Sequence, residues 1–415
     1  MENQLMDHLF RHHYGKMVSV LTRIFGLAHL ETIEDAIQDT FIKALSAWRK
    51  QQPEYPEAWL TQAAKNRVLD IFRKLKSEKQ RAHSFSSGME ARAINELFLD
   101  TEIKDSQLRM IFTACHPSLA PSEQIAFSLK TISGFSTREI ASALLTKEET
   151  VKKRLSRARK TIKSRELSFE IPSGKELPKR TSSVLEVLYL IFNEGFHSNR
   201  TDILIRKELC SEAMRLCQLL LTHPAVRTPD GYALFSLMCF HASRLDSRVD
   251  DAGVMVDLEH QDRSQWLFPL IRLGNDSMEK AVESGAFSHY HYEAAIAAEH
   301  IKARTFAETD WKRILLWRSR LYELQPTAIG SLNLVIVYLQ LGELEKANEL
   351  LQQIDPGRLE QRAYLYYGTM AEYYVLNGEP EKALSSLDLA LATVINRNEK
   401  EYLLGKKNKL SEINL

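Results

Sequence analysis

Eight lysines and arginines, and no acidic residue, lie between Val151 and Arg165. Cations at this density neutralise nucleic-acid phosphates, and Lys and Arg also bind base edges in the major groove of DNA. Apolar side chains in this stretch recur at i, i+4, i+7 and i+11, which predicts an amphipathic helix. They are Val151, Leu155, Ala158 and Ile162. The predicted chemistry is therefore non-covalent recognition of DNA, and the alternative is a solvated basic helix in an ordinary bundle.

Two helix-start signals position this stretch. Ser136 is followed three residues later by Glu139, and Thr146 is followed three residues later by Glu149. In such a capping box, each side chain accepts a hydrogen bond from the backbone N–H of the other residue. We therefore expect two short helices, each beginning one residue after the Ser or Thr and joined by a tight turn. This pattern is typical of a helix-turn-helix whose second helix enters a major groove.

Charge is distributed unevenly along the 415 residues. The formal net charge is only +1, but residues 1–165 carry 27 Lys and Arg against 19 Asp and Glu. Residues 166–415 carry 28 Lys and Arg against 35 Asp and Glu. The first part therefore suits an anionic partner and the second does not.

No residue pattern indicates catalysis or a cofactor. The sequence lacks a Gly-rich phosphate loop and a Ser/His/Asp arrangement, so we expect no enzymatic activity, no cofactor and no metal. Without CxxC spacing, the four cysteines are expected to be buried reduced thiols: Cys115, Cys210, Cys217 and Cys239. No apolar run approaches 18 residues and no signal peptide is present, so we expect a cytoplasmic protein that does not contact a membrane.

Three helices are expected in the first 80 residues, over residues 5–24, 34–49 and 57–79. In the second, apolar positions 37, 41, 44, 45 and 48 form a buried stripe, which leaves an acidic face with Ile42 exposed. This face is either a docking surface or a solvated helix side. The third helix interleaves basic residues with aromatics such as Trp59. That mixture suits unpaired nucleic acid, although such aromatics are more often part of a core.

Pro, Gly and Ser clusters divide the chain. Helices over 107–115, 122–132, 137–145 and 147–164 are expected to form a compact domain that ends in the basic helix. The predicted fold is all-α, with two small helical domains followed by a helical extension. The expected domain ranges are 1–80, a linker over 81–104, 105–166, a linker over 167–180, and 181–415.

Four segments together resemble the two-domain layout of extracytoplasmic-function (ECF) sigma factors of bacterial RNA polymerase. In chain order they are DAIQDTFIKALSAW, PEAWLTQAAKNRVLDIFRK, LAPSEQIAFSLKTISGFSTREIASALL and ETVKKRLSRARKTI. The resemblance covers nearly all of residues 1–165. It implies a protein of the sigma-70 family that directs transcription initiation, with core RNA polymerase and promoter DNA as partners.

The resemblance also implies site residues. The first segment would bind core polymerase through Asp35, Gln38, Asp39, Phe41 and Leu45. The second would bind the −10 promoter element through Trp59, Lys65, Asn66, Arg67, Asp70, Arg73 and Lys74, and the loop at 81–85 would hold a flipped-out base. The helix-turn-helix would read the −35 element through Thr150, Lys152, Lys153, Arg154 and Arg157.

The C-terminal part contains an internal repeat. Residues 341–347, LGELEKA, recur as NGEPEKA at 377–383, and Tyr338 has its counterpart in Tyr374. A period near 34 residues predicts tetratricopeptide-like helical hairpins. The full chain resembles the ECF sigma factors that carry such an extension. We expect this extension to modulate the sigma domains, through an intramolecular contact or a protein or peptide partner.

Two other interpretations remain open. A conventional helix-turn-helix regulator with a helical sensor domain would leave residues 35–80 unexplained. An enzyme built on the helical half would need the His and Glu residues between 289 and 300 to bind metal, but they lack a metal-binding motif and are more simply structural. The loop at 257–266 is either a ligand site or a structural loop anchored by Trp266, and the structural interpretation is favoured.

Overall fold

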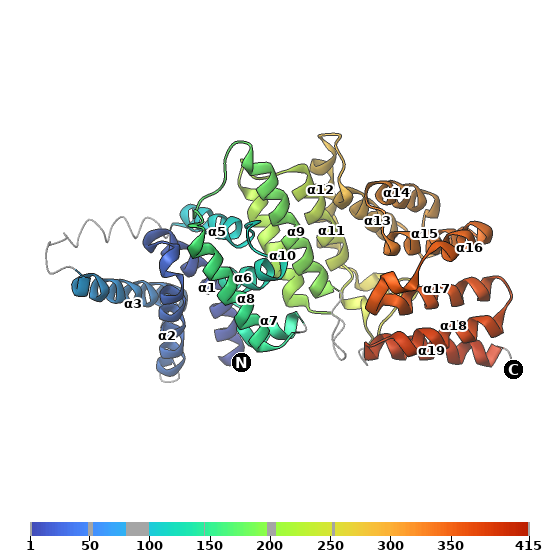
Figure 1. The fold of residues 1–415 in the computed structure, drawn as a ribbon, viewed down its shortest axis with the longest axis horizontal. Helices are drawn as coiled ribbons and strands as arrows, with labels where there is room; N and C mark the ends of the chain where they lie inside the picture. The colour runs from blue at the N-terminus through green and yellow to red at the C-terminus, as the bar shows by residue number, and fades with distance from the viewer. Residues whose placement is uncertain are drawn as a thin grey trace. The chain divides into compact units, whose positions relative to one another are not determined.

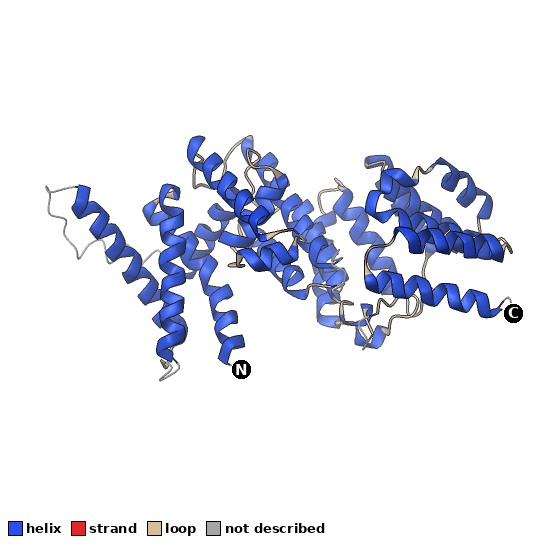
Figure 2. Ribbon diagram, turned by 60° about the horizontal axis from the view of Figure 1, so that its bottom comes forward, coloured by secondary structure: helices blue, strands red, loops and turns tan. Residues whose placement is uncertain are grey.

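The computed structural model describes residues 2–48, 53–79, 99–144, 146–196, 205–250 and 254–413. Every regular element in these ranges is a helix (Figures 1 and 2). The only strand-like pairing described is an isolated bridge between Val249 and Met255. The predicted all-α fold is confirmed. The chain divides into two compact units, Met1–Leu190 and Ile191–Leu415, and each is described by itself.

Three long helices begin the first unit: α1 (Glu2–Phe25), α2 (Leu30–Trp48) and α3 (Pro56–Lys79), with a short 3-10 turn η1 (Leu27–His29) before α2. They pack against one another through fully buried side chains. These are Tyr14, Met17, Leu21, Ile33, Ile37, Leu60 and Val68. The apolar periodicity of the sequence predicted all three helices, because side chains three or four residues apart share one face of a helix.

Four further helices follow in the same unit: α5 (Asp100–Ala114), α6 (Pro121–Thr131), α7 (Thr137–Ala143) and α8 (Glu148–Ser164). The apolar stripe predicted for α8 is confirmed, because Val151, Leu155, Ala158 and Ile162 are all buried. Helix α5 begins at residue 100, inside the range expected to be a linker, and residues 81–98 of that range lie outside the described residues.

The two capping predictions had different outcomes. At α7 the box is present: the Glu139 N–H donates to Ser136 Oγ at 3.1 Å, and the Ser136 N–H donates to Glu139 Oε2 at 2.8 Å. At α8 the prediction was wrong, because the N-cap residue is Lys147 and no side-chain hydrogen bond caps the helix. The helix begins one residue later than expected, and the Glu149 carboxylate instead accepts a hydrogen bond from Lys152 Nζ at 2.9 Å.

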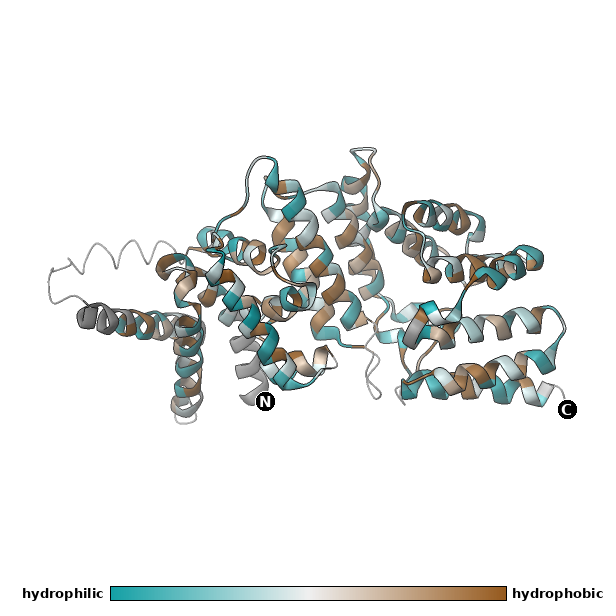
Figure 3. Cartoon of the chain, viewed as in Figure 1, coloured by the Kyte–Doolittle hydropathy of each residue, from teal (hydrophilic) through white to brown (hydrophobic). Residues whose placement is uncertain are grey.

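The second unit continues the helical pattern. Helix α9 (Glu176–Phe196) runs from the first unit into it. The helices that follow are α10 (Lys207–Thr222), α11 (Pro229–Ala242), α12 (Phe268–Val282), α13 (His289–Lys302), α14 (Trp311–Leu324), α15 (Ala328–Gln340), α16 (Leu344–Gln353), α17 (Ala363–Leu376), α18 (Pro380–Thr393) and α19 (Arg397–Ile413). Helix α11 is apolar along most of its length (Figure 3), and α10, α12 and α13 pack around it. A helix that is apolar on all sides is a core helix.

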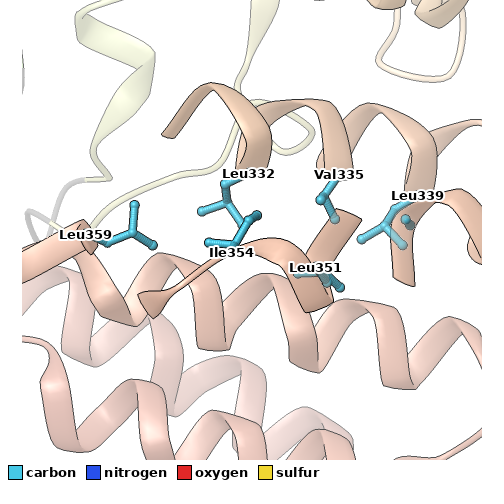
Figure 4. Packing of buried hydrophobic residues seen from close by; sticks show 7 residues of the cluster. Leu332, Val335, Leu339, Leu351, Ile354 and Leu359 are labelled. Carbon is cyan, nitrogen blue, oxygen red and sulfur yellow. The ribbon is translucent and has the colours of Figure 1, made fainter. Parts of the chain in front are cut away.

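The sequence repeat corresponds to two helical hairpins, α15–α16 and α17–α18. Each hairpin turns at a glycine with positive φ, +73° at Gly342 and +75° at Gly378, which favours glycine because it lacks a Cβ. Apolar side chains of α15, α16 and the following segment point toward one another (Figure 4). They include Leu332, Val335, Leu339, Leu351, Ile354 and Leu359. Stacked hairpins of this kind bury a core that one hairpin could not bury alone.

Candidate nucleic-acid interface

Helix α8 presents its cations on the side opposite its buried stripe. Lys152, Lys153 and Arg157 are exposed, whereas Thr150 and Arg154 are partly buried at the flanks of the helix. Among these residues, Lys152 is 2.9 Å from the Glu149 carboxylate, and both side chains are exposed. Exposed ion pairs contribute little free energy, so a DNA phosphate can replace Glu149 at small cost.

Helix α3 carries a second surface with aromatic and polar side chains. Trp59 is 39% exposed, and its ring meets that of Trp48 edge to face at 5.6 Å between centroids. This contact fixes one side of the indole ring and leaves much of it accessible. Asn66 and Asp70 are exposed on the same helix, and Gln62 donates a hydrogen bond to Asn66 at 3.0 Å. An exposed, braced aromatic ring is a platform on which an unpaired base can stack.

Helix α2 carries the acidic face expected from its sequence. Asp35 and Asp39 are exposed, Gln38 is partly exposed, and Ile42 is 62% exposed. Asp39 Oδ2 lies 3.5 Å from Arg67 Nη2 on α3. The candidate polymerase-binding face and the candidate −10 surface therefore meet at this ion pair.

Two of the expected contact residues lie inside the domain. Phe41 is 3% exposed and Lys65 is 5% exposed, and burial lowers the pKa of the Lys65 ammonium. Both side chains therefore support the surface from beneath and do not form part of it. The side chains of Leu45, Arg73 and Lys74, and the loop at 81–85, lie outside the described residues.

The sequence reasoning missed one group of polar residues. Glu34 is 2% exposed, and its Oε2 lies 2.5 Å from Arg159 Nη2 of α8. The Tyr14 hydroxyl donates to the other Glu34 oxygen at 3.3 Å, and Arg159 Nη1 lies 3.5 Å from Glu31. Burial raises the pKa of Glu34, while the Arg159 guanidinium opposes that rise. The sequence did contain one sign that Glu34 is buried. Glu34 lies three residues before Ile37 and therefore on the same face of α2 as the apolar stripe.

The loop at 257–266 is a structural element of the second unit. Arg263 Nη1 donates to the backbone oxygens of His300 at 2.7 Å and Ala303 at 2.8 Å, at the C-terminal end of α13. Trp266 is buried, and its indole N–H donates to Ser247 Oγ at 2.9 Å. The loop therefore satisfies backbone carbonyls that the end of a helix leaves without partners. These contacts support the structural interpretation of the loop.

The His and Glu residues near α13 are used within the fold. His291 Nε2 lies 3.0 Å from the Ala281 carbonyl oxygen, and its Nδ1 lies 3.0 Å from Ser288 Oγ. His300 lies edge to face against Trp311. Across the described ranges, no three His, Cys, Asp or Glu residues are grouped so that they could hold a metal ion.

The four cysteines are buried and free, as predicted. Burial raises the pKa of every one of these thiols, to about 12 at Cys115. A thiol becomes a nucleophile only when it is deprotonated, so these cysteines are unreactive at neutral pH. Within the described ranges, no helix combines the length and apolar character needed to cross a lipid bilayer.

Comparison with known families assigns the helices of the first unit. The profile for sigma-70 region 2 matches residues 9–78, and the profile for sigma-70, region 4 matches residues 109–162. These matches cover the acidic face, the Trp59 surface and the basic helix α8. A third profile, a family of unknown function (DUF6596), matches residues 180–282. Sigma-70 families are DNA-binding transcription regulators and not enzymes.

Two relatives extend this comparison. An uncharacterized protein, R00370 of Rhizobium meliloti, is 31% identical over 382 residues, which are 90% of this chain and 89% of the relative. The ECF RNA polymerase sigma factor SigE of Mycolicibacterium smegmatis is 28% identical over 157 residues, which are 38% of this chain and 60% of SigE. No solved structure shows significant similarity. The two sigma-70 regions in this order and the similarity to SigE show that the chain belongs to the ECF group of the sigma-70 family.

Proposed function

We propose that the protein binds core RNA polymerase, recognises the −10 and −35 promoter elements and directs transcription initiation in the cytoplasm. One observation carries the proposal: an exposed aromatic surface at Trp59 and an exposed basic face on α8, both suited to nucleic acid, accompany an acidic face on α2. A conventional regulator needs only the helix-turn-helix, whereas a sigma factor needs all three surfaces.

The acidic face of α2 is suited to a basic protein surface. Asp35 and Asp39 supply negative charge, and the exposed Ile42 supplies apolar area between them and the end of the helix. Charged rims around an apolar contact speed association and select the partner. We assign this face to core polymerase, with Gln38 as a further polar contact.

The Trp59 surface is suited to melted DNA. Its exposed indole can stack on an unpaired base, and Asn66 offers hydrogen bonds to a base edge. Basic residues of α3 add electrostatic attraction to the strand. The exposed face of α8 is suited to duplex DNA, because Lys153 and Arg157 project from a helix that can enter the major groove.

The C-terminal helices supply regulation in this proposal. Residues 166–415 carry 28 Lys and Arg against 35 Asp and Glu, opposite in sign to the excess in residues 1–165. Opposite net charges attract, so the extension can compete with DNA for the sigma domains or bridge to polymerase. The stacked hairpins α15–α18 offer a helical surface for a protein or peptide partner.

The test is in vitro transcription with purified core polymerase. The full-length protein is expected to direct initiation from its promoters, and a truncation after Leu190 is expected to change the level of initiation. The truncation retains residues 176–190, because Arg180 of α9 donates a hydrogen bond to the Phe112 carbonyl oxygen in the first unit. DNA binding without core-dependent transcription would refute the sigma-factor function and indicate a conventional regulator. Unchanged initiation by the truncated protein would refute regulation by the extension.

A further inference from the structure

A cavity in the second unit is lined by helices that are far apart in the chain. It encloses about 260 Å³ and lies among α13, α14, α15, α17 and α19. One wall is the start of the loop at 257–266, where Asp257 accepts a hydrogen bond from the Tyr402 hydroxyl of α19 at 3.0 Å. This bond joins residues 145 positions apart, so the anchored loop also shapes the cavity. Small-molecule sites begin at about 300 Å³, so the cavity suits a small ligand.

Helix α15 presents a partly polar stripe to the cavity. Asn333, Ile336 and Gln340 recur at i, i+3 and i+7 and all line it. Each lies one position after a residue of the hairpin core, such as Leu332 before Asn333 (Figure 4), so the core and the cavity use different faces of the helix. Asn333 and Gln340 are half-buried, and within the described part of the chain neither side-chain amide has a hydrogen-bond partner. A largely apolar helix therefore offers two amides to the cavity.

The sequence repeat places an acidic group beside this stripe. Glu372 of α17 lies 36 residues after Ile336, the same offset that separates Tyr338 from Tyr374, and it lines the same cavity. Equivalent positions of two consecutive hairpins therefore face one space. The Glu372 carboxylate is half-buried, and no hydrogen bond or close ion pair to it is found in the described ranges. A ligand can therefore bind this carboxylate without displacing a partner.

Negative charge is in excess where the cavity borders α17 and α19. Burial lowers the pKa of the Lys406 ammonium, but Glu372 and Asp257 are among the groups that raise it overall. These three charged groups therefore lie close together. The exposed Glu259 lines the same cavity, so among the described residues three carboxylates outnumber one ammonium here. This side of the cavity is suited to a cation.

Positive charge lies where α13 and α14 border the cavity. Burial lowers the pKa of His300 to about 3, and the charges of Arg244, Arg318 and Arg263 lower it further. His300 is therefore neutral at neutral pH, whereas Arg318, which lines the cavity, is a cation. The rings of His300 and Trp311 meet edge to face at 5.4 Å between centroids and add apolar surface. This side is suited to an anion next to an apolar group.

These groups match a short peptide with free ends. An ammonium fits the carboxylates, and a carboxylate fits Arg318. Each side-chain amide has an N–H donor and a C=O acceptor, which are the groups that a peptide backbone pairs with. Asn333 and Gln340 are about 10.5 Å apart along the helix axis, and an extended chain covers that distance in about three residues. A segment inside a partner protein has the same backbone but lacks the two terminal charges.

We propose that this cavity binds a linear peptide of two or three residues with free ends and an apolar side chain, held by Asn333, Gln340 and Glu372. The inference deepens the role proposed for the C-terminal helices, because a peptide bound here would make that regulation depend on the supply of small peptides. Binding itself needs neither polymerase nor DNA. Its failure would therefore leave the sigma-factor function standing.

The test is isothermal titration calorimetry with the full-length protein. The probes are Ala-Phe-Ala, Ala-Ala-Ala, N-acetyl-Ala-Phe-Ala, the same peptide blocked at both ends, and glucose as an uncharged molecule that also forms hydrogen bonds. We expect Ala-Phe-Ala to bind with a Kd between about 10 μM and 1 mM. Ala-Ala-Ala should bind more weakly because it buries less apolar area. The doubly blocked peptide should bind at least about tenfold more weakly because it lacks both charges.

Three variants assign the site within the cavity. Glu372→Gln should weaken Ala-Phe-Ala binding by about tenfold but leave N-acetyl-Ala-Phe-Ala unaffected, because only the free peptide has an ammonium. Asn333→Leu and Gln340→Leu should weaken both peptides by about fivefold, because each removes hydrogen bonds to the backbone.

The controls make the same chemical changes outside the cavity. Glu381→Gln on α18 and Gln353→Leu next to the end of α16 alter exposed side chains and should leave binding unchanged. Circular dichroism and thermal melts check that each variant is folded.

Each outcome decides a separate part of the inference. No binding of Ala-Phe-Ala at up to about 10 mM would overturn the site, and a water-filled crevice would remain. Equal affinity for the free and doubly blocked peptides would overturn recognition of the charged ends. Glucose binding that Ala-Phe-Ala does not displace would overturn the peptide chemistry. Peptide binding that none of the three folded variants weakens would overturn the assignment to this cavity.

Discussion

The N-cap of α7 allows a matched test of how the helix-turn-helix is built. Ser136→Ala removes the acceptor of the hydrogen bond from the Glu139 N–H, whose length is 3.1 Å. Thr146→Ala also removes a side-chain hydroxyl group, ten residues later. The sequence predicted that Thr146 would cap α8, but no side chain caps that helix. The two variants remove similar hydroxyl groups from the same motif, so only the local geometry distinguishes them.

The expected magnitude follows from the contacts at each position. Replacing a Ser that caps a helix by Ala costs about 1 kcal/mol, which is about a fivefold change in a local opening equilibrium. Helix α7 has only seven residues, so it has few other hydrogen bonds to resist that opening. Thr146→Ala should change the free energy of opening by less than about 0.5 kcal/mol, because no cap is lost.

The assay is amide hydrogen exchange followed residue by residue. The amides of Ile140 and Leu144, which donate to Ser136 and Ile140 carbonyl oxygens, should exchange about fivefold faster in Ser136→Ala. The Val151 amide at the start of α8 should be unchanged in both variants. Equal acceleration by Thr146→Ala and Ser136→Ala would refute the assignment of the cap. If Ser136→Ala slows binding to −35 DNA and Thr146→Ala does not, then the cap of α7 helps to position α8 for DNA binding.

Three further predictions concern DNA binding, the second unit and pH. Lys153→Ala should lower −35-dependent initiation by about tenfold and leave core-polymerase pull-down intact, and loss of both would contradict the division into two binding regions. Arg263→Ala should destabilise the C-terminal turn of α13 by about 2 kcal/mol, as measured by hydrogen exchange, because two carbonyls lose a charged donor. Arg304 is exposed, so Arg304→Ala serves as the control. If both substitutions destabilise α13 equally, the proposed role of Arg263 is contradicted. Burial lowers the pKa of His300 from 6.5 to about 3, so the unfolded chain binds a proton that the folded chain does not. Stability of the second unit should therefore fall as pH drops from about 6.5 toward 3, by at most about 1.4 kcal/mol per pH unit. In thermal melts at several pH values, His300→Gln should remove this part of the pH dependence of stability. If stability depends on pH in the same way in the variant, His300 is not its source.

Sequence reasoning worked best where structure depends on near neighbours. The helices of both units, the α7 cap and the repeated turns at Gly342 and Gly378 all follow from residues within one or two helical turns. The same reasoning placed Asp35, Asp39 and the α8 cations on the surface, because each lies opposite an apolar stripe. For Trp59 the spacing favoured a core position, whereas its ring is 39% exposed. Whether these residues bind polymerase and DNA stays a prediction.

The sequence by itself determined the helical class and the charged character of the surfaces, since these depend on local periodicity and residue type. The order of the two sigma regions followed from the resemblance of four segments to ECF sigma factors. The tertiary structure decided which polar residues are available. Lys65 is buried although the resemblance placed it among the DNA contacts, and α8 starts at Glu148 without the expected cap. Phe41 is buried, as its place in the apolar stripe predicted, although the resemblance made it a polymerase contact. The structure alone also paired Glu34 with Arg159 across 125 positions. Local patterns cannot predict such a pair, because its energy depends on burial and on which helices meet when the chain is folded.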